Sequence, residues 1–194
     1  MRRRFQATLQ AALECWGLPL KAGQVRRLGD HYEAMVAANQ RFNLTRITEP
    51  EGAAVKHYAD SLAPVAWARE RGVEVTTVLD IGTGAGFPAV PLAVARPDWS
   101  ITAIDATRKK IDFLESICSE MSFGNLRCVH AHSQHWKGGQ RFSLVVFRAL
   151  TAVPRAIESA AAYVQPGGHV AAFTTPSTRA SSREETARVA AARG

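Results

Sequence analysis

Cysteine is scarce in this sequence. The chain has three, Cys15, Cys118 and Cys128, among 194 residues, and no two of them are closely spaced. Disulfide-stapled domains and thiolate metal sites need more cysteines, or cysteines that lie close together. This scarcity excludes a disulfide framework, argues against a thiolate metal centre and fits a reducing compartment. We expect the three thiols to act as small apolar side chains.

Long apolar runs are also missing. No window approaches the roughly 18 apolar residues that a membrane-spanning helix needs. The basic start, MRRRF, is followed by neither a long apolar core nor a small-residue cleavage site, so we expect no signal peptide. These absences predict a cytoplasmic protein without a membrane partner.

Acidic residues are outnumbered by basic ones. Lys and Arg total 24 against 17 Asp and Glu, which gives a formal net charge of +7. A basic excess favours polyanionic partners, and nucleic acid is the commonest of these. The hydrophobic fraction of 46% is ordinary for a globular chain and excludes general disorder.

Helical periodicity dominates the first 70 residues. Apolar residues recur at helical spacing over residues 5–16 and 22–41, and a third helix is predicted over 50–70. Thr48 is the expected N-cap of this third helix, with Glu51 as its capping-box partner. We therefore predict an N-terminal helical extension over residues 1–70.

The pattern changes after residue 70. Short β-rich apolar runs alternate with helix-length segments, which predicts an α/β fold with a mostly parallel sheet and helices on both faces. The expected strands span 76–81, 100–105, 126–131, 142–147 and 169–175, and the expected helices span 86–96, 107–122 and 151–164. We interpret residues 71–194 as one compact domain, with a frayed helix in the polar tail at 177–194.

Three alternating glycines, Gly82, Gly84 and Gly86, follow the first expected strand. In a parallel α/β sheet, ligands bind outside the carboxyl ends of the strands, and bare Cα atoms let a ligand approach the backbone. Asp80 precedes this loop, and Asp105 ends the next strand, where a carboxylate suits the two hydroxyls of a ribose. An acid, G-x-G-x-G and a second acid in this order resemble S-adenosylmethionine-dependent methyltransferases.

Each part of this pattern also has a purely structural interpretation. Asp80 would cap a helix or turn, Asp105 would be the N-cap of the following helix, and the glycines would serve only tight packing. A nicotinamide-dependent oxidoreductase is another class with a glycine loop. Its G-x-G-x-x-G pattern, however, requires glycine where this chain has Phe87.

A closer resemblance rests on five blocks of sequence. They are FNLTRIT (42–48), KHYADSL (56–62), LDIGTGAGFPAVPLA (79–93), IDATRKKIDFL (104–114) and FRAL (147–150). Over about residues 24–176, the chain resembles the ribosomal RNA small subunit methyltransferase G family, also called glucose-inhibited division protein B. The resemblance implies a Rossmann-like class I methyltransferase sheet, S-adenosyl-L-methionine as cofactor and methylation of a guanine N7 in 16S ribosomal RNA. The implied partner is 16S rRNA or the small ribosomal subunit, and we expect a monomer.

The candidate cofactor-binding residues have two sources. The resemblance implies contacts from Gly82, Phe87, the pair Ser133–Gln134 and Arg148. The loop and ribose arguments add Asp80, Gly84 and Asp105 from the residues themselves.

The implied reaction does not call for a general base. Guanine N7 carries a free lone pair and the sulfonium is a strong electrophile, so catalysis can rest on positioning. No catalytic residue is assigned, and His57, Asp60 and Arg148 are positioning candidates. His57 and Asp60 share one helix face, which suits either a buried structural hydrogen bond or a face that closes over the transfer site. Arg148 suits a carboxylate or an RNA phosphate, with a solvated surface arginine as the alternative.

The chain departs from the family pattern in three places. His132 and Gln134 stand at the family's arginine and acid positions, Thr174 and Thr175 replace a lysine, and the chain ends at Gly194, before the family's last two strands. His130 and His132 are expected to point the same way along a strand, but no clear third ligand accompanies them, so we expect no metal. These departures support an alternative function, a non-catalytic RNA- or ribosome-binding protein on a degenerate methyltransferase scaffold.

Overall fold

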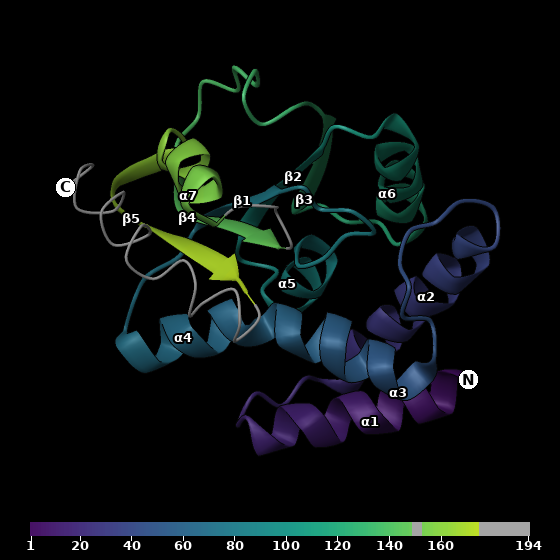
Figure 1. The fold of residues 1–194 in the computed structure, drawn as a ribbon. Helices are drawn as coiled ribbons and strands as arrows, with labels where there is room; N and C mark the ends of the chain where they lie inside the picture. Colours follow the sequence, from purple (N-terminus) through teal and green to yellow (C-terminus); the bar gives the residue numbers. More distant parts are fainter. Residues whose placement is uncertain (149–152, 175–194) are drawn as a thin grey trace.

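The computed structural model describes residues 1–148 and 153–174, and Figure 1 shows how their helices and strands are arranged. Thr175, the last two residues of the FRAL block and the predicted frayed helix at 177–194 lie outside the described residues.

The three predicted N-terminal helical regions are present. The first two are α1 (Arg2–Cys15) and α2 (Ala22–Asn39). The third is a continuous stretch of four segments: α3 (Pro50–Ala53), the π-helical turn η1 (Ala54–Ala59), the 3-10 turn η2 (Asp60–Leu62) and α4 (Ala63–Arg71). Short π turns occur inside α-helices, often at functional sites, which makes η1 a candidate part of a functional site.

The predicted N-cap at Thr48 is wrong. The N-cap of α3 is Glu49, and no side-chain capping bond forms there. Pro50 occupies the first helical position, which suits its fixed φ and missing N–H. Thr48 instead accepts a hydrogen bond from the Tyr32 hydroxyl on its backbone carbonyl, at 2.8 Å.

The sheet has five parallel strands in the order β3-β2-β1-β4-β5. The strands are β1 (Thr77–Ile81), β2 (Ser100–Asp105), β3 (Leu126–His130), β4 (Phe142–Arg148) and β5 (Val164–Phe173). The connecting helices are α5 (Ala89–Ala95), α6 (Arg108–Glu120) and α7 (Val153–Ala161). The predicted α/β fold with a parallel sheet is confirmed. Strand order reverses between β1 and β4, and ligands bind such sheets at this switch point.

Strand β5 begins five residues earlier than the sequence indicated. Its first residues include Pro166 and Gly167, which read as a turn because both disfavour strands. The pairing with β4 jumps from Phe142–Val164 to Leu144–His169, so an irregularity absorbs these residues. Within the described residues, β5 is an edge strand of the sheet, where a proline is tolerated.

Helices cover both faces of the sheet (Figure 1). One face, through Val78, Leu144 and Val146, packs in a large core with α5, α6 and the N-terminal helices. The alternate residues of the same strands, such as Leu79 and Val145, pack against α7. This alternation places Asp80 and Arg148 on the face of the N-terminal helices, because side chains alternate along a strand.

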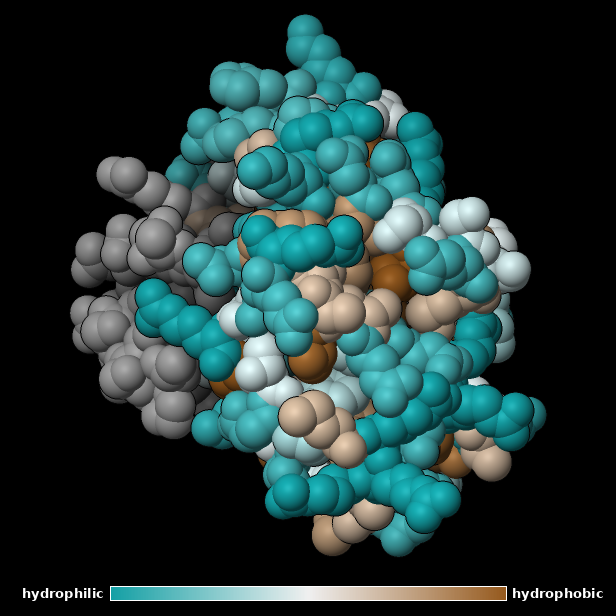
Figure 2. Space-filling model, turned by 90° about the vertical axis from the view of Figure 1, so that its right-hand side faces the viewer, coloured by the Kyte–Doolittle hydropathy of each residue, from teal (hydrophilic) through white to brown (hydrophobic). Residues whose placement is uncertain are grey.

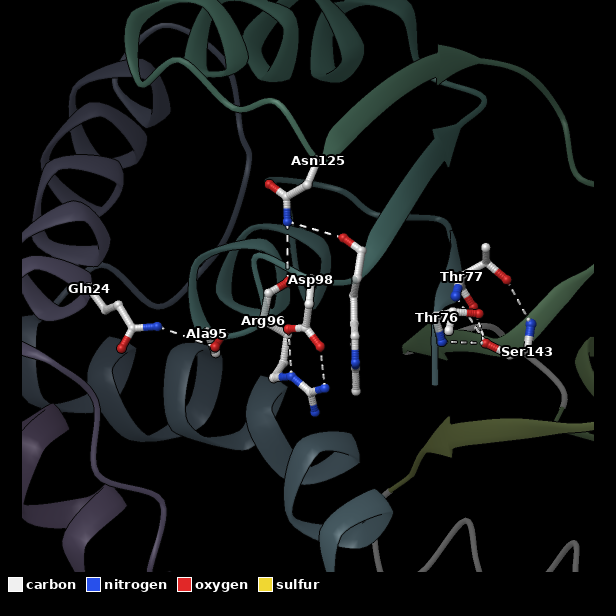
Figure 3. Close-up of polar contacts among 9 residues, drawn as sticks. Gln24, Thr76, Thr77, Ala95, Arg96, Asp98, Asn125 and Ser143 are labelled. Carbon is white, nitrogen blue, oxygen red and sulfur yellow. Dashed lines mark hydrogen bonds and ion pairs between the residues drawn. The ribbon is translucent and has the colours of Figure 1, made fainter. Parts of the chain in front are cut away.

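Polar side chains secure the edge where the strands begin, which we call the amino edge (Figure 3). The Ser143 hydroxyl accepts from the amides of Thr76 and Thr77, each at 3.0 Å, and donates to the Thr77 carbonyl at 2.8 Å. The Asn125 side-chain amide lies within hydrogen-bond distance of three backbone carbonyls at the end of α5 and before β2. Gln24 of α2 donates to the Val94 and Ala95 carbonyls at the end of α5.

Figure 2 shows the side of the molecule on which α2 and α6 lie, and that surface is mostly hydrophilic with scattered apolar groups. Across residues 1–148 and 153–174, no helix is long and apolar enough to cross a membrane. The three cysteines are free thiols: Cys118 and Cys128 are half-buried with their sulfur atoms 3.5 Å apart, whereas Cys15 is exposed and does not fill the core as the sequence predicted.

Candidate functional site

The glycine loop lies at the edge where the strands end, which we call the carboxyl edge. Gly82, Gly84 and Gly86 have φ values of +76°, +61° and +97°, so all three adopt a conformation that other residues rarely take. The Gly82 amide donates to the Ile104 carbonyl of β2 at 2.8 Å, which ties the loop to the neighbouring strand.

Two of the glycines have different surroundings. A Cβ on Gly86 would lie 2.6 Å from Val90 Cγ2 and 2.8 Å from Leu114 Cδ2, so Gly86 permits close packing. A Cβ on Gly84 would meet only the Gly82 carbonyl oxygen, at 4.0 Å. The packing interpretation therefore explains Gly86 but does not explain Gly84, which faces open space.

The Asp105 carboxylate holds the loop from the end of β2. Its Oδ2 accepts from the Gly84 amide at 3.0 Å, and its Oδ1 accepts from the Thr107 amide at 2.8 Å. Lys110 Nζ lies 3.5 Å from Oδ2. Asp105 is not the N-cap of α6, because Thr107 occupies that position. Each carboxylate oxygen can accept about two hydrogen bonds, so acceptor capacity remains for a ligand.

Asp80 is fully buried near the start of α5. Its Oδ2 accepts from the Ala89 amide, the first of α5, at 3.1 Å, which agrees with the capping interpretation. Its Oδ1 has no hydrogen-bond partner. Burial raises the pKa of Asp80 to about 7, although the nearby Thr83 hydroxyl and the Ala89 amide favour the ionised form. Capping therefore accounts for one carboxylate oxygen and leaves the other available.

Arg148, the last residue of β4, joins the sheet to the π turn. One terminal nitrogen donates to the Lys56 carbonyl of η1 and lies 3.1 Å from Asp60 Oδ2. The other, Nη1, is buried without a partner. Burial lowers the pKa of the guanidinium, and Asp60 opposes this effect. With only 23% of its side chain exposed, Arg148 is not a solvated surface arginine.

His57 lies on η1 beside the glycine loop. Its Nε2 is 2.7 Å from Thr45 Oγ1, and its ring stacks on Phe87 at 4.8 Å between centroids. Burial, and next the charge of Arg148, lower the pKa of His57 to about 4, so the imidazole is neutral at pH 7. His57 Nδ1 has no partner. The structure thus gives His57 and Asp60 different partners, Thr45 and Arg148, rather than a bond to each other.

Five buried polar side-chain atoms of the described residues have no hydrogen-bond partner, and four belong to residues around the carboxyl edge. Those four are His57 Nδ1, Asp80 Oδ1, Thr83 Oγ1 and Arg148 Nη1. Buried polar groups are usually paired, because leaving one unpaired costs about 1–3 kcal/mol. Their concentration at the switch point indicates a site that a polar ligand completes.

Comparisons with known proteins show the family of this chain. The family model described as rRNA small subunit methyltransferase G matches residues 24–193. The chain belongs to this family. A member named ribosomal RNA small subunit methyltransferase G, from Microcystis aeruginosa, is 45% identical over 108 residues, which are 54% of this chain and 48% of the relative. Another of that name, from Levilactobacillus brevis, is 33% identical over 175 residues, 87% of this chain and 72% of the relative.

The family model thus matches most of this chain. The chain itself spans about half the length of the Microcystis relative. A crystal structure of a precorrin-6y C5,15-methyltransferase from Geobacter metallireducens matches with a TM-score of 0.54 at 16% identity, over 74% of this chain and 72% of that one. This match shows the fold. The predicted family, the methyltransferase class and the Rossmann-like fold are confirmed.

The turn after β3 carries His132 and Gln134, two of the residues expected to depart from the family pattern. Strand β3 ends at His130, whose Nε2 lies 3.0 Å from the Ala106 carbonyl, so His132 is in the turn. The prediction that His130 and His132 point the same way along one strand is therefore wrong. Ser133 accepts from the Tyr163 hydroxyl on its carbonyl, whereas Gln134 is exposed. No group of three potential metal ligands occurs among the described residues.

Thr174, which the sequence pointed to as a replacement for a family lysine, follows β5 directly and is exposed. Three residues of the site were missed from sequence: His31, Tyr58 and Thr83. Thr83 lies within the quoted glycine block, so its hydroxyl could have been included among the candidate site residues. Tyr58 likewise lies within the quoted KHYADSL block, whereas His31 looked like an ordinary member of an amphipathic helix and no local pattern distinguished it.

Proposed function

We propose that this chain transfers a methyl group from S-adenosylmethionine to N7 of a guanine in 16S ribosomal RNA, in the cytoplasm. One observation carries the proposal. The Gly84 amide and the Asp105 carboxylate are bonded at 3.0 Å beside open space, at the switch point of a methyltransferase G sheet.

The residues at the carboxyl edge fit the parts of the cofactor. Asp105, with acceptor capacity left, suits the ribose hydroxyls, and Gly82 and Gly84 leave room for the backbone to approach the ligand. Asp80 Oδ1, an unpartnered acceptor when ionised, suits the ammonium group of the amino-acid end. Arg148 Nη1, an unpartnered donor, suits its carboxylate. Phe87 packs its ring on His57, so any contact it makes with the cofactor is through its backbone. Ser133 and Gln134, in the turn after β3, remain candidates for the adenine.

The proposed reaction requires the protein mainly to position the cofactor and the guanine. When bound, the cofactor supplies a methyl group on a positively charged sulfur. Guanine N7 would accept that methyl group with its free lone pair, so the residues of the site would need to hold the two reactants in line rather than move a proton. His57 is neutral at pH 7, so it places no cation beside the sulfonium. Arg148 holds η1 against the end of β4 through the Lys56 carbonyl and holds η2 there through the Asp60 ion pair, which supports a positioning role for all three candidates.

The RNA partner is proposed from charge and family membership together. The net charge of +7 favours a polyanion, and phosphate contacts of this kind weaken as salt rises. We further propose 16S rRNA or the small subunit as substrate, a monomeric enzyme, and the division into a helical extension at 1–70 and a methyltransferase domain at 71–194.

The first test is calorimetric titration with S-adenosylmethionine and with its demethylated product. We expect dissociation constants on the order of micromolar, near ordinary working concentrations. Binding should be lost in Gly82→Val and Asp105→Ala. Gly72→Val is the matched control, because Gly72 ends α4 at φ +63° with nothing within 4 Å of a Cβ.

The second test is transfer of a tritiated methyl group to 16S RNA and to isolated small subunits, with the position read by borohydride and aniline cleavage at N7-methylguanosine. Cofactor binding with transfer to N7 supports the proposal. RNA binding without cofactor binding or transfer would overturn it in favour of the non-catalytic scaffold.

A further inference from the structure

His31 of α2 is a fully buried imidazole with a partner on each nitrogen. Its Nδ1 lies 2.7 Å from the Tyr58 hydroxyl of η1, and its Nε2 lies 3.0 Å from the Ala85 carbonyl in the glycine loop. The side chain therefore connects three segments that are far apart in the sequence.

The partners determine which nitrogen carries the proton. The Ala85 carbonyl can only accept, so Nε2 carries the hydrogen and donates it. Nδ1 then accepts from the Tyr58 hydroxyl. Burial lowers the pKa of His31 to about 4, so this neutral tautomer is the form present at pH 7. The result is a directed chain of hydrogen bonds from Tyr58 through His31 to Ala85.

This series of hydrogen bonds acts on a single peptide plane of the glycine loop. The Ala85 carbonyl belongs to the same peptide unit as the Gly86 amide, and that amide donates to the Thr83 carbonyl at 2.9 Å. His31 thus holds one end of the plane, and Thr83 holds the other. Because Gly84 and Gly86 on either side allow wide backbone rotation, this plane is the part of the loop that most needs fixing.

We propose that His31 and Tyr58 are positioning residues that hold the glycine loop in its cofactor-binding conformation. The inference rests on the proposed function for its effect on cofactor affinity, but its effect on the loop does not depend on that function. Tyr58 acts through the orientation of His31: without its hydroxyl, Nδ1 keeps a buried lone pair with no donor, and the imidazole loses one of the two bonds that fix its position. The Nε2–H group would then be directed less well at the Ala85 carbonyl, and the contact that fixes the loop would weaken.

The chain offers a close control. Tyr32, next to His31 on α2, is as buried as Tyr58, and its hydroxyl donates to the Thr48 carbonyl, away from the glycine loop. Tyr32→Phe and Tyr58→Phe therefore remove the same group from the same core cluster. A role in packing alone predicts equal effects of the two substitutions.

The experiment compares the full chain with Tyr58→Phe, Tyr32→Phe, His31→Phe and the double variant His31→Phe/Tyr58→Phe. Amide hydrogen exchange over residues 82–88 should accelerate in Tyr58→Phe and His31→Phe, but not in Tyr32→Phe. The dissociation constant for S-adenosylmethionine should rise roughly tenfold in Tyr58→Phe, a factor close to the net worth of one hydrogen bond. In the methyl-transfer assay, the cofactor KM should rise while kcat stays unchanged.

The double variant tests whether Tyr58 acts on the glycine loop through His31. If Tyr58 acts through His31, adding Tyr58→Phe to His31→Phe has no further effect on exchange or affinity. Equal changes in Tyr32→Phe and Tyr58→Phe, or additive losses in the double variant, would overturn the inference. A wild-type chain that binds no cofactor would contradict the proposed function alone, because the exchange comparison over residues 82–88 would still decide the role of His31.

Discussion

The amino and carboxyl edges of this sheet use buried polar groups in opposite ways. At the amino edge, the Ser143 hydroxyl accepts twice and donates once, and the Asn125 amide is surrounded by carbonyl acceptors. At the carboxyl edge, four residues each keep a buried polar atom without a partner (His57, Asp80, Thr83 and Arg148), whereas Trp99 Nε1 is the one such atom at the amino edge among the described residues. Such atoms destabilise a folded chain, and they are expected where a ligand completes them. One edge therefore stabilises the fold, and the other is prepared for binding.

The largest expected change in the free energy of unfolding is that of Asp80→Asn at the carboxyl edge. The pKa of Asp80 is raised from 3.8 to about 7 by burial, so its stabilising contribution is fully present below pH 4 and is lost as the pH rises to 7. Above pH 7 the ionised carboxylate lowers the free energy of unfolding by about 4 kcal/mol relative to a neutral group. Asp80→Asn should therefore be more stable than the wild type at pH 8, with a gap that closes towards pH 4, while cofactor affinity falls.

Chemical denaturation of both proteins from pH 4 to pH 8 measures this gap directly. The pKa of His31, lowered to about 4, makes both proteins lose stability as the pH falls from 6.5, but that loss cancels in the difference. A gap that is constant with pH would show that Asp80 is not the titrating group.

Next in size is Ser143→Ala at the amino edge. Two amides and one carbonyl of the segment that opens β1 would lose their partner, and we expect the free energy of unfolding to fall by about 3 kcal/mol. Ser116→Ala is the control, because Ser116 is an exposed serine whose hydroxyl donates to the Phe113 carbonyl on α6. Urea denaturation measures the loss, and calorimetry should give an unchanged cofactor affinity. A weaker affinity at unchanged stability would contradict the division of roles between the two edges.

The smallest expected effect on stability comes from Gly84→Ala. Its left-handed backbone makes alanine unfavourable by about 1 kcal/mol, and no atom blocks the added methyl group. Gly72→Ala has nearly the same φ and should lose as much stability. Only Gly84→Ala should weaken cofactor binding in the calorimeter, and equal affinities would show that the open space at Gly84 is not part of the site.

The residues found from sequence were those whose signal is local. Gly84 and Asp105 were recognisable because a strand end, a glycine pattern and a second strand end follow one another closely. The end of β5 was found, but not its start, because Pro166 and Gly167 resemble a turn unless the irregular pairing with β4 is known. The cap at Thr48 failed because Pro50 fixed the start of α3 one residue later.

His31 shows why the remainder of the site was not predictable. Its two partners lie on η1 and on the glycine loop, and only the assembled core brings them together. An amphipathic-helix pattern counts His31 as one more inward-facing position, with no indication of which polar groups it meets.

The π turn η1 also affects how the chain tolerates insertions and deletions. A π turn holds one more residue per turn than the bonding of an α-helix requires, so deleting a single residue within 54–59 would let the segment rewind as a regular helix. Because an α-helix covers the same turn with one residue fewer, the flanking segments would keep their relative orientation, and the change in facing would fall on the side chains within 54–59. Tyr58 and His57 would no longer face His31 and Phe87, although most of the composition and the helix itself would be kept. In this part of the chain, residue number is constrained more tightly than residue identity.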